Sequence, residues 1–255
     1  MRGLDGKHVL VTGGGGAIGR AICRRFGEER SIVGVLDKNA ESAAETVRIV
    51  REAGGQAHPV IVDITDHAAV GRAVADFEEQ ARPIDVLVNN AGWDRLSTFL
   101  DSEPPLWDQL IAINLRGPLN LHHHVGRRMA GRRRGRIVNI ASDAGRVGSS
   151  GEAVYSACKG GIIAFSKSLA RELARFQINV NVVCPGPTDT PILQSFLGEG
   201  EEGKRIYEGL KKAIPFRRIA QPDDIQGMVV FLASDDAAYL TGQVVSVSGG
   251  LTMHG

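Results

Sequence analysis

An α/β fold built on one doubly wound parallel sheet is the architecture that the sequence predicts. Short β-branched runs alternate with longer helical stretches, the runs are apolar almost throughout, and no repeat or low-complexity linker interrupts them. This alternation favours parallel strands with helices on both faces. Parallel strands are buried on both sides, which explains why the runs lack polar alternation. We expect one domain over residues 1–255.

Seven short runs rich in valine and isoleucine are the expected strands, at residues 8–12, 32–36, 59–62, 86–88, 135–140, 180–183 and 244–247. One helix is expected directly after the first strand. Further helices are predicted where apolar residues recur every three or four positions, over residues 40–53, 67–81, 104–130, 153–175 and 222–233.

Residues 187–215, between the sixth and seventh strands, break the alternation with a segment rich in glycine and glutamate. A long connection after the C-terminal end of a strand is typical of a mobile lid. We therefore expect a substrate lid here, rather than a surface excursion without a role.

The composition, 43% apolar and 23% charged, is that of an ordinary globular protein. The net charge of +1 gives no field that would attract nucleic acid or an anionic membrane. No apolar run approaches the ~20 residues of a membrane span. The cysteines Cys23, Cys158 and Cys184 are odd in number and widely spaced, which favours neither disulfides nor zinc. With a start that leads directly into a strand, these features predict a cytoplasmic protein without a signal peptide.

A glycine-rich turn, residues 13–19, joins the first strand to the next helix. Glycines let the chain turn sharply and let a pyrophosphate approach the backbone, and the helix end offers free N–H groups. The G-x-G-x-x-G match at 14–19 is weak by itself, because glycine turns without a ligand are common. Its position between strand and helix, with Asp37 ending the second strand, makes a dinucleotide site the favoured interpretation.

Asp37 predicts NAD as the cofactor. A carboxylate at this position accepts hydrogen bonds from the ribose hydroxyls of adenosine and repels the 2′-phosphate of NADP. No arginine or lysine in the glycine turn offsets that repulsion. Lys38 is the feature that favours NADP, because a basic residue here could hold a phosphate.

Two other strand ends carry candidate cofactor contacts. Asp63, with Ile64 beside it, is expected to meet the adenine; the alternative for Asp63 is a helix N-cap, for which Thr65 and Asp66 are better placed. Small residues after the fourth strand suit a turn that faces a ligand near the switch point of the sheet. These are Asn90, Ala91 and Gly92.

Tyr155 and Lys159 stand four positions apart in a helical stretch, so both project from one face. A free tyrosine has a pKa near ~10 and is a poor base at neutral pH. We expect the ammonium of Lys159 to lower that pKa. Ser142 lies just past the fifth strand. Y-x-x-x-K by itself is a weak signal, because a surface tyrosine beside an unrelated lysine gives the same pattern.

The glycine turn, Asp37, Asn89-Asn90-Ala91-Gly92, Asn114, Ser142, Tyr155-Ser156-Ala157-Cys158-Lys159 and Pro185-Gly186 occur in one order. In this order the chain resembles the short-chain dehydrogenase/reductase family over essentially its whole length. The resemblance implies a Rossmann-type sheet with strand order 3-2-1-4-5-6-7 and an enzyme that moves a hydride between NAD and a secondary alcohol or ketone.

The resemblance also implies roles for the matching residues. Tyr155 would be the general acid/base, Ser142 would bind the substrate oxygen, Lys159 would hold the nicotinamide ribose, and Asn114 would anchor a water that links Lys159 to solvent. Cofactor contacts are implied at Gly13, Gly16, Ala17, Ile18, Gly19, Asp37, Asp63, Ile64, Asn90, Ala91, Gly92, Tyr155, Lys159, Pro185, Gly186, Thr188 and Thr190.

One position departs from the family pattern T-G-x-x-x-G-x-G, because Ala17 stands in place of its middle glycine. Alanine is the smallest substitute and begins a helix well. We expect a small shift of the turn, with cofactor affinity rather than chemistry affected.

Several segments resemble a narrower group of the family, whose substrates are ring β-hydroxyacyl-CoA thioesters. They are residues 90–94, 140–155, 183–190 and 246–253. A CoA thioester carries phosphates that arginine and lysine side chains would bind, and the candidates are Arg146, Arg217, Arg218, Lys211 and Lys212. The alternatives are a 3-oxoacyl-carrier-protein reductase, a dehydrogenase of CoA-free cyclic alcohols and, from another class, a dinucleotide-binding sensor without turnover.

The remaining features point to packing and assembly. His122, His123 and His124 occupy consecutive helix positions, so their side chains should fan around the axis without sharing a metal ion. We expect no metal site. Residues 104–130 and 153–175 resemble the helices through which the family forms homotetramers.

Overall fold

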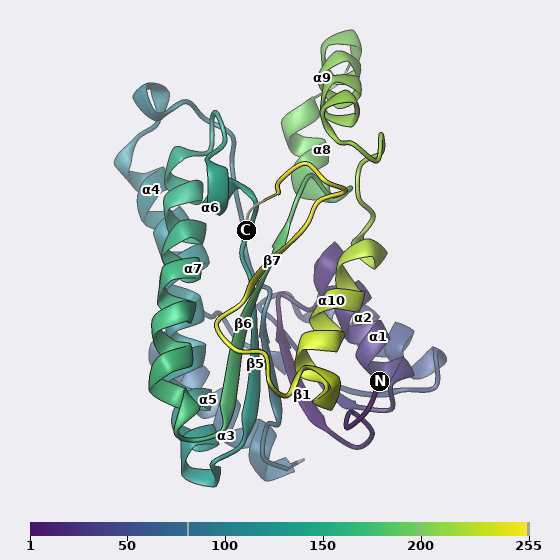
Figure 1. Ribbon diagram of the computed structural model, residues 1–255, viewed down its shortest axis with the longest axis vertical. Coiled ribbons are helices and arrows are strands. Elements are labelled where there is room, and N and C mark those ends of the chain that lie inside the picture. The colour runs from purple at the N-terminus through teal and green to yellow at the C-terminus, as the bar shows by residue number, and fades with distance from the viewer. Residues whose placement is uncertain (81, 199, 254–255) are drawn as a thin grey trace.

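A computed structural model of the protein describes residues 1–80, 82–198 and 200–253. In this part of the chain, seven parallel strands form one sheet in the expected order, β3-β2-β1-β4-β5-β6-β7 (Figure 1). The strands are β1 (His8–Thr12), β2 (Ile32–Asp37), β3 (Gln56–Ile61), β4 (Val86–Asn89), β5 (Gly135–Ile140), β6 (Ile178–Pro185) and β7 (Val244–Val247). Residue 81, in one expected helix, residue 199, in the expected lid, and residues 254–255 lie outside the described residues.

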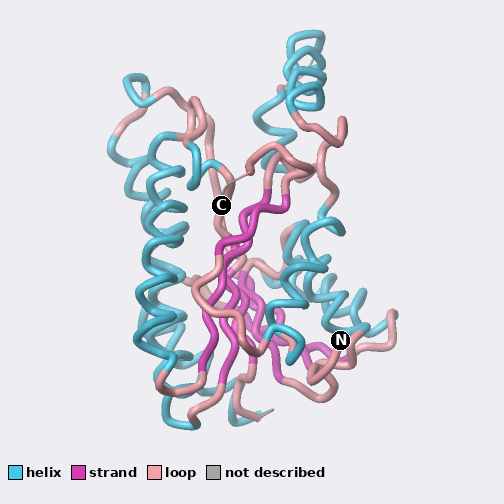
Figure 2. Tube along the Cα trace, in the orientation of Figure 1, coloured by secondary structure: helices cyan, strands magenta, loops and turns pink. Residues whose placement is uncertain are grey.

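Helices cover both faces of the sheet, as Figure 2 shows. One face carries α1 (Ala17–Glu28), α2 (Ala40–Glu52) and α10 (Pro222–Ala233), and the other carries α3 (His67–Gln80), α4 (Pro104–Ile111), α5 (Gly117–Arg132) and α7 (Ala153–Ala174). The shorter elements are α6 (Ala144–Val147), α8 (Pro191–Leu197), α9 (Gly200–Ala213), the 3₁₀ turns η1 (Phe99–Asp101) and η3 (Asp235–Ala237), and the π-helical segment η2 (Ala112–Arg116).

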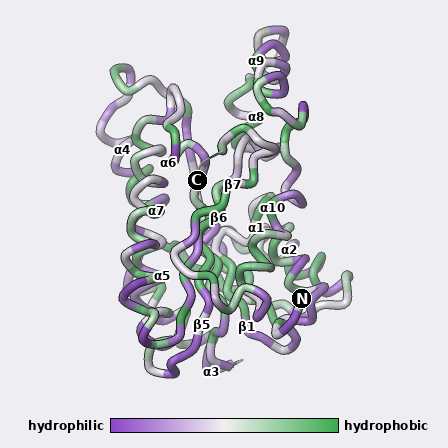
Figure 3. Tube along the Cα trace, in the orientation of Figure 1, coloured by the Kyte–Doolittle hydropathy of each residue, from purple (hydrophilic) through white to green (hydrophobic). Residues whose placement is uncertain are grey.

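The core consists of two main apolar clusters, one on each side of the sheet. Strand β1 contributes to both, because Val9 and Val11 pack toward α1 and α10 while Leu10 packs toward α3 and α5. Figure 3 shows hydrophobic residues along the central strands, whereas α9 is mostly hydrophilic. Burial on both faces is the physical reason for the continuous apolar runs in the sequence.

The third strand differs most from its expected range of residues 59–62. It begins at Gln56 and ends at Ile61, at the edge of the sheet. His58 and Pro59 are exposed there, and an edge strand tolerates both a polar side chain and a proline. An edge strand therefore lacks the apolar signal that marks the central strands.

The expected lid, residues 187–215, contains the helices α8 and α9, which extend beyond the carboxyl ends of β6 and β7 (Figure 1). Thr190 caps α8 by accepting the N–H of Leu193 at 3.3 Å. Helix α9 has little apolar burial, since Ile206 is 44% exposed. No helix in the described ranges is both long and apolar enough to span a membrane.

Candidate active site at the carboxyl ends of the strands

The turn between β1 and α1 is lined by backbone and tightly packed. Gly13 has a φ of +61°, and a Cβ atom there would lie 2.7 Å from Cα of Ala91. A Cβ atom at Gly19 would lie 2.1 Å from the carbonyl oxygen of Gly13. Helix α1 begins after Gly16, which provides no side-chain cap for the first N–H groups. The turn therefore fits a pyrophosphate, because free N–H groups and the positive end of a helix attract an anion.

Ala17 and Ile18 are the first two residues of α1, and both are half-buried. The alanine that replaces the family glycine thus begins a regular helix, consistent with its high helix propensity.

Hydrogen bonds tie the end of β4 to the glycine turn. Thr12 Oγ1 accepts the N–H groups of Asn90 and Ala91, both at 3.0 Å. Asn90 Nδ2 donates to the carbonyl oxygens of Thr12 at 3.0 Å and Gly13 at 3.1 Å. The side chain of Asn90, expected from the sequence to contact the cofactor, is therefore engaged in shaping the turn.

The carboxylate of Asp37 lies against the glycine turn. Its Oδ2 accepts the N–H of Gly15 at 3.0 Å, and its Oδ1 accepts the N–H of Asn39 at 3.0 Å. Asp37 is half-buried, while Lys38 is exposed. The acidic group thus ends β2 and lies beside the turn, and the basic group next to it is exposed.

Asp63 lies two residues beyond the end of β3. Its Oδ1 accepts the N–H and the hydroxyl of Thr65, both at 2.8 Å, and these hydrogen bonds, led by the backbone one, lower the pKa of Asp63. Asp66 caps α3 by accepting the N–H of Ala69 at 2.9 Å. Asp66 is therefore the N-cap of α3. Ile64, which follows Asp63 in the sequence, is buried.

Ser142, Tyr155 and Lys159 come together where β5 ends and α7 begins. Lys159 Nζ lies 5.5 Å from the ring centroid of Tyr155 and donates to the carbonyl oxygen of Ile140 at 3.1 Å. The hydroxyl of Ser142 is within hydrogen-bonding reach of the Tyr155 phenol. Lys159 is only 3% exposed. The structure thus brings together a hydroxyl, a phenol and a buried ammonium from two separate elements.

Burial shifts the pKa values of this cluster. Burial, followed by the neighbouring carboxyls of Asp94 and Glu152, raises the pKa of Tyr155, while the hydrogen bond from Ser142 opposes this. Burial lowers the pKa of Lys159 to about 8. In the protein without cofactor, removal of the phenolate from water is the larger effect, and the lowering of the phenol pKa by Lys159 stays a prediction for the site with its cofactor bound.

A carboxyl pair beside Tyr155 was not expected from the sequence. Asp94 is 6% exposed, its Oδ1 accepts the N–H of Arg95 at 2.8 Å, and its Oδ2 has no conventional donor. Burial and then hydrogen bonding to the Glu152 carboxyl raise the pKa of Asp94 to about 7. Two close carboxyls repel each other when both are ionised, which is one physical reason for the raised pKa of Asp94. The contact joins residues far apart in the sequence, and no local pattern signals it.

Replacing Asp94 with asparagine should stabilise the protein above pH 7. The folded protein holds a proton on Asp94 that the unfolded chain releases near pH 4, so stability falls as the pH rises between about 4 and 7. Asparagine keeps a neutral hydrogen-bonding group beside Glu152. We expect Tm at pH 8 to rise by ~2–4 °C, which corresponds to about 1 kcal/mol.

Thermal unfolding at several pH values checks this prediction. The difference in Tm between the Asp94→Asn variant and the wild-type protein should become smaller as the pH is lowered toward 5. Asp108→Asn, at an exposed position on α4, is the control and should show no such trend. A gain in Tm at pH 8 that is equally large at pH 5 would exclude the raised pKa of Asp94 as its cause.

Asn114 lies in the π-helical segment η2 and is fully buried. Its Oδ1 accepts the N–H of Trp93 at 3.1 Å, and its Nδ2 donates to the carbonyl oxygens of Trp93 at 2.7 Å and Leu110 at 3.0 Å. Gly92 packs against both Asn114 and Lys159. Local π-helical turns occur often at functional sites, and here the turn presents Asn114 to the loop after β4.

The loop after β6 borders the same site. The N–H of Gly186 donates to the carbonyl oxygen of Val247 at 3.1 Å, and the hydroxyl of Thr188 donates to the carbonyl oxygen of Gly186 at 2.9 Å. Pro185 is the last residue of β6, and Thr190 begins α8 as its cap. These residues connect the site to the α8–α9 segment.

A second Y-x-x-x-K pattern shows that the spacing alone is not specific. Lys211 Nζ lies 5.5 Å from the ring centroid of Tyr207 on α9, the same distance as in the Tyr155–Lys159 pair. Lys211 also forms an ion pair with Glu208 at 2.8 Å. The burial of Lys159, which is 3% exposed, and the proximity of Ser142 distinguish the Tyr155–Lys159 pair at the strand ends.

Comparisons with known proteins agree with this geometry. A family model described as "Enoyl-(Acyl carrier protein) reductase" matches residues 15–252. Sorbitol dehydrogenase of Cereibacter sphaeroides is 36% identical over 97% of this chain and 98% of the relative. A 3-oxoacyl-[acyl-carrier-protein] reductase of Thermotoga maritima is 34% identical over 98% of this chain and 99% of the relative. The structure of an NAD⁺-bound xylitol dehydrogenase superposes with a TM-score of 0.92 at 32% identity, covering 98% of this chain and all of the other.

The fold, the glycine turn and these matches define an oxidoreductase that acts on alcohols or ketones. The chain belongs to the short-chain dehydrogenase/reductase family.

Proposed function

We propose that this protein oxidises a secondary alcohol to a ketone with NAD and that Tyr155 is its general acid/base. The observation that carries the proposal is the cluster of Ser142, Tyr155 and Lys159 at the strand ends, with Lys159 Nζ 5.5 Å from the Tyr155 ring. The cluster lies on the same edge of the sheet as a glycine turn that fits a pyrophosphate. Phenol, ammonium and hydroxyl are the groups that proton transfer to or from an alcohol oxygen requires.

The glycine turn and the α1 N-terminus would hold the pyrophosphate of the cofactor, and the carboxylate of Asp37 would bind the adenosine ribose. When bound, NAD supplies the hydride acceptor and a positive charge near the phenol. The other contacts are those implied by the family pattern at Asp63, Ile64, Ala91, Gly92, Lys159, Pro185, Gly186, Thr188 and Thr190.

In the oxidation direction, Tyr155 Oη takes the proton of the substrate hydroxyl while Ser142 binds the same oxygen. The reverse reaction returns the proton to the oxygen. Lys159, held on the carbonyl oxygen of Ile140, fixes a positive charge behind the phenol. Burial and the carboxyls of Asp94 and Glu152 raise the phenol pKa, so ionisation of Tyr155 depends on the positive charges of Lys159 and of the bound cofactor.

The substrate that we favour is 2-hydroxycyclohexanecarboxyl-CoA, or a related alicyclic β-hydroxyacyl-CoA. The basic residues beside the α8–α9 segment differ in availability, because Arg218 pairs with Asp224 and Lys211 with Glu208. Lys212 and Arg217 are exposed and have no ion pair within the described residues. Phe216, next to Arg217, is 72% exposed. Exposed cations beside an apolar ring would suit the phosphates of CoA, with α8 and α9 as the lid.

The names of two relatives of similar sequence identity suggest two alternative functions. The Thermotoga maritima relative is named a 3-oxoacyl-[acyl-carrier-protein] reductase, and the Cereibacter sphaeroides relative is named a sorbitol dehydrogenase. A sensor without turnover is disfavoured, because Asn114, Ser142, Tyr155 and Lys159 are all present. Resemblance to the family further favours a homotetramer that assembles through α5 and α7, in the cytoplasm.

A comparison of matched substrates tests the proposal. The protein is incubated with NAD and either a hydroxyacyl-CoA thioester of a cyclohexane ring or the corresponding CoA-free cyclic alcohol, and reduced NAD is followed by absorbance. We expect kcat/KM to be at least tenfold higher for the thioester, equal to about 1.4 kcal/mol of added transition-state binding. Equal values would contradict CoA recognition, and turnover only with a 3-oxoacyl-carrier protein and NADPH would favour the reductase.

A further inference from the structure

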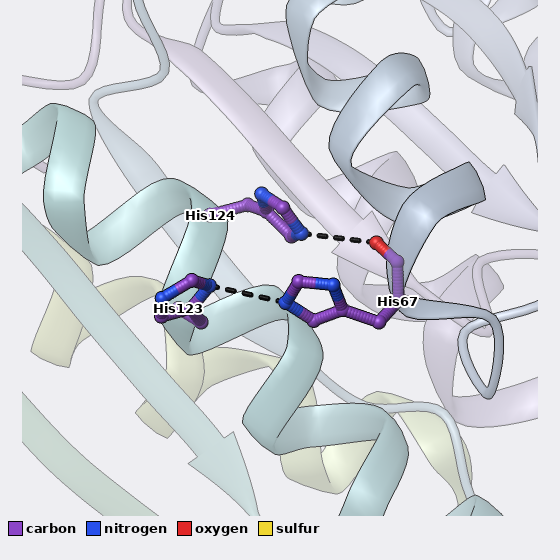
Figure 4. A group of neighbouring side chains, drawn as sticks. All are labelled: His67, His123 and His124. Atoms are coloured by element: carbon purple, nitrogen blue, oxygen red, sulfur yellow. Dashed lines mark hydrogen bonds between the residues drawn. The ribbon is translucent and has the colours of Figure 1, made fainter.

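Three histidines from two helices meet on the surface, away from the candidate active site. His67 is the first residue of α3, and His123 and His124 lie in the middle of α5 (Figure 4). One ring nitrogen from each residue lies within 4.8 Å of the other two. His67 Nε2 and His123 Nδ1 are hydrogen-bonded at 3.1 Å. His67 and His123 are exposed, and His124 is half-buried.

The helical spacing of the consecutive histidines predicted divergent side chains, and only His122 follows this expectation. His122 is 5% exposed and turns into the core, where its ring packs edge-on against Phe165. His123 and His124 both face α3. The ring centroid of His67 lies 5.1 Å from that of His123 and 4.3 Å from that of His124. Gly71 makes room for His124, since a Cβ atom there would lie 2.7 Å from its ring. The packing of α3 on α5 therefore brings the rings of His67, His123 and His124 together, which the spacing along α5 alone did not predict.

The spacing of the ring nitrogens suits a bound metal ion. Two nitrogens on one tetrahedral zinc ion, each at ~2.0–2.1 Å from it, are about 3.3 Å apart. The observed 3.1 Å between His67 Nε2 and His123 Nδ1 is close to that value. His124 Nε2 now donates to the carbonyl oxygen of His67 at 2.9 Å, and its ring would have to turn from that oxygen toward the ion.

The donor atoms define the class of ion. Imidazole nitrogen binds zinc, nickel and copper, whereas calcium and magnesium require oxygen ligands. The cysteine thiols do not compete, because Cys23, Cys158 and Cys184 are all buried.

We propose that His67, His123 and His124 form a binding site for a divalent transition-metal ion, with zinc as its ligand, that ties the start of α3 to α5. Three protein ligands leave one tetrahedral position for water, which the exposure of the site allows. An ion there crosslinks two helices that pack on the same face of the sheet, and it stabilises the folded chain because the unfolded chain does not hold the three rings together.

Zinc titration of the full-length protein, without a polyhistidine tag and freed of metal with a chelator, tests this site. A chromophoric zinc indicator reports competition at pH 7.5, and thermal unfolding reports stabilisation. We expect one zinc ion per chain, a Tm that rises with zinc, and no effect of magnesium. His67→Ala and His123→Ala should each weaken zinc binding at least tenfold. His58→Ala, at an exposed histidine on β3, should bind zinc like wild type.

Cobalt gives a readout that misfolding cannot mimic. Wild-type protein with Co²⁺ should show the visible bands of nitrogen-coordinated cobalt, and His67→Ala with an unchanged metal-free Tm should lose them. Zinc affinity should also fall from pH 7.5 to pH 5.5, because protonated imidazole does not bind metal. Wild-type protein that binds no zinc, or binds it equally well after His67→Ala, would show a hydrogen-bonded histidine cluster only and would overturn the proposal.

Discussion

Replacing Tyr155 with phenylalanine should reduce turnover by ~10²–10⁴-fold, the range over which general acid/base catalysis contributes. Phenylalanine keeps the ring that packs beside Lys159 but removes the oxygen that takes the substrate proton. The hydrogen bond with Ser142 is lost at the same time. Binding of NADH should persist, because the glycine turn and Asp37 do not depend on the phenol oxygen. Steady-state assays give the turnover, and fluorescence titration gives the binding of NADH.

Tyr239→Phe is the matched control, because Tyr239 is fully exposed and lies outside the site. It should leave kcat and KM unchanged. If Tyr155→Phe kept more than about a tenth of wild-type activity, a loss well below that expected of an acid/base residue, the base would have to be another group.

Replacing Asp37 with asparagine should lower the preference for NAD over NADP by at least tenfold, equal to about 1.4 kcal/mol. Asparagine has nearly the same shape but no charge, so it removes the repulsion between the carboxylate and the 2′-phosphate. It also weakens the hydrogen bonds that a carboxylate accepts from the ribose hydroxyls. The carboxylate lies directly on the turn, with Oδ2 3.0 Å from the Gly15 nitrogen, so we expect both kcat/KM values to change in opposite directions.

Measurement of kcat/KM for both cofactors, each at subsaturating concentration, checks this prediction. Glu41→Gln is the control, because it removes an exposed negative charge from the first turn of α2 close by. Because salt screens this charge, the ratio of kcat/KM with NAD to kcat/KM with NADP should stay within about twofold of the wild-type ratio. A wild-type protein that already prefers NADP would refute the NAD assignment and give Lys38 the decisive role.

The sheet was predictable because its signals are local. Five strands are largely buried and appear as apolar runs, and β7 contains three valines although it is only half-buried. The long helices carry clear three-to-four periodicity. Helices α6, α8 and α9 escaped prediction because the first is a single turn and the other two lie in a segment whose glycines disfavour helix. The start of β3 escaped prediction because this edge strand exposes four of its six residues.

The candidate site was predictable in its members but not in its contacts. Ser142, Tyr155 and Lys159 meet because β5 and α7 are adjacent, which the order of the elements implies. The engagement of Asn90 with the glycine turn, the carboxyl pair of Asp94 and Glu152, and the approach of His67 to His123 each depend on packing between distant segments. Local pattern carries no information about such pairs.

A measurement of hydride transfer tests the central claim most directly. The claim is that Tyr155 and its neighbours promote exchange of hydride between a carbinol carbon and NAD. Wild-type protein is incubated with NAD and a panel of cyclic secondary alcohols and hydroxyacyl-CoA thioesters carrying deuterium on the carbinol carbon, and the reduced cofactor is analysed by mass spectrometry. We predict one deuterium on the nicotinamide ring from at least one member of the panel. Reduced cofactor without deuterium, or no reduced cofactor from any member, would contradict the claim.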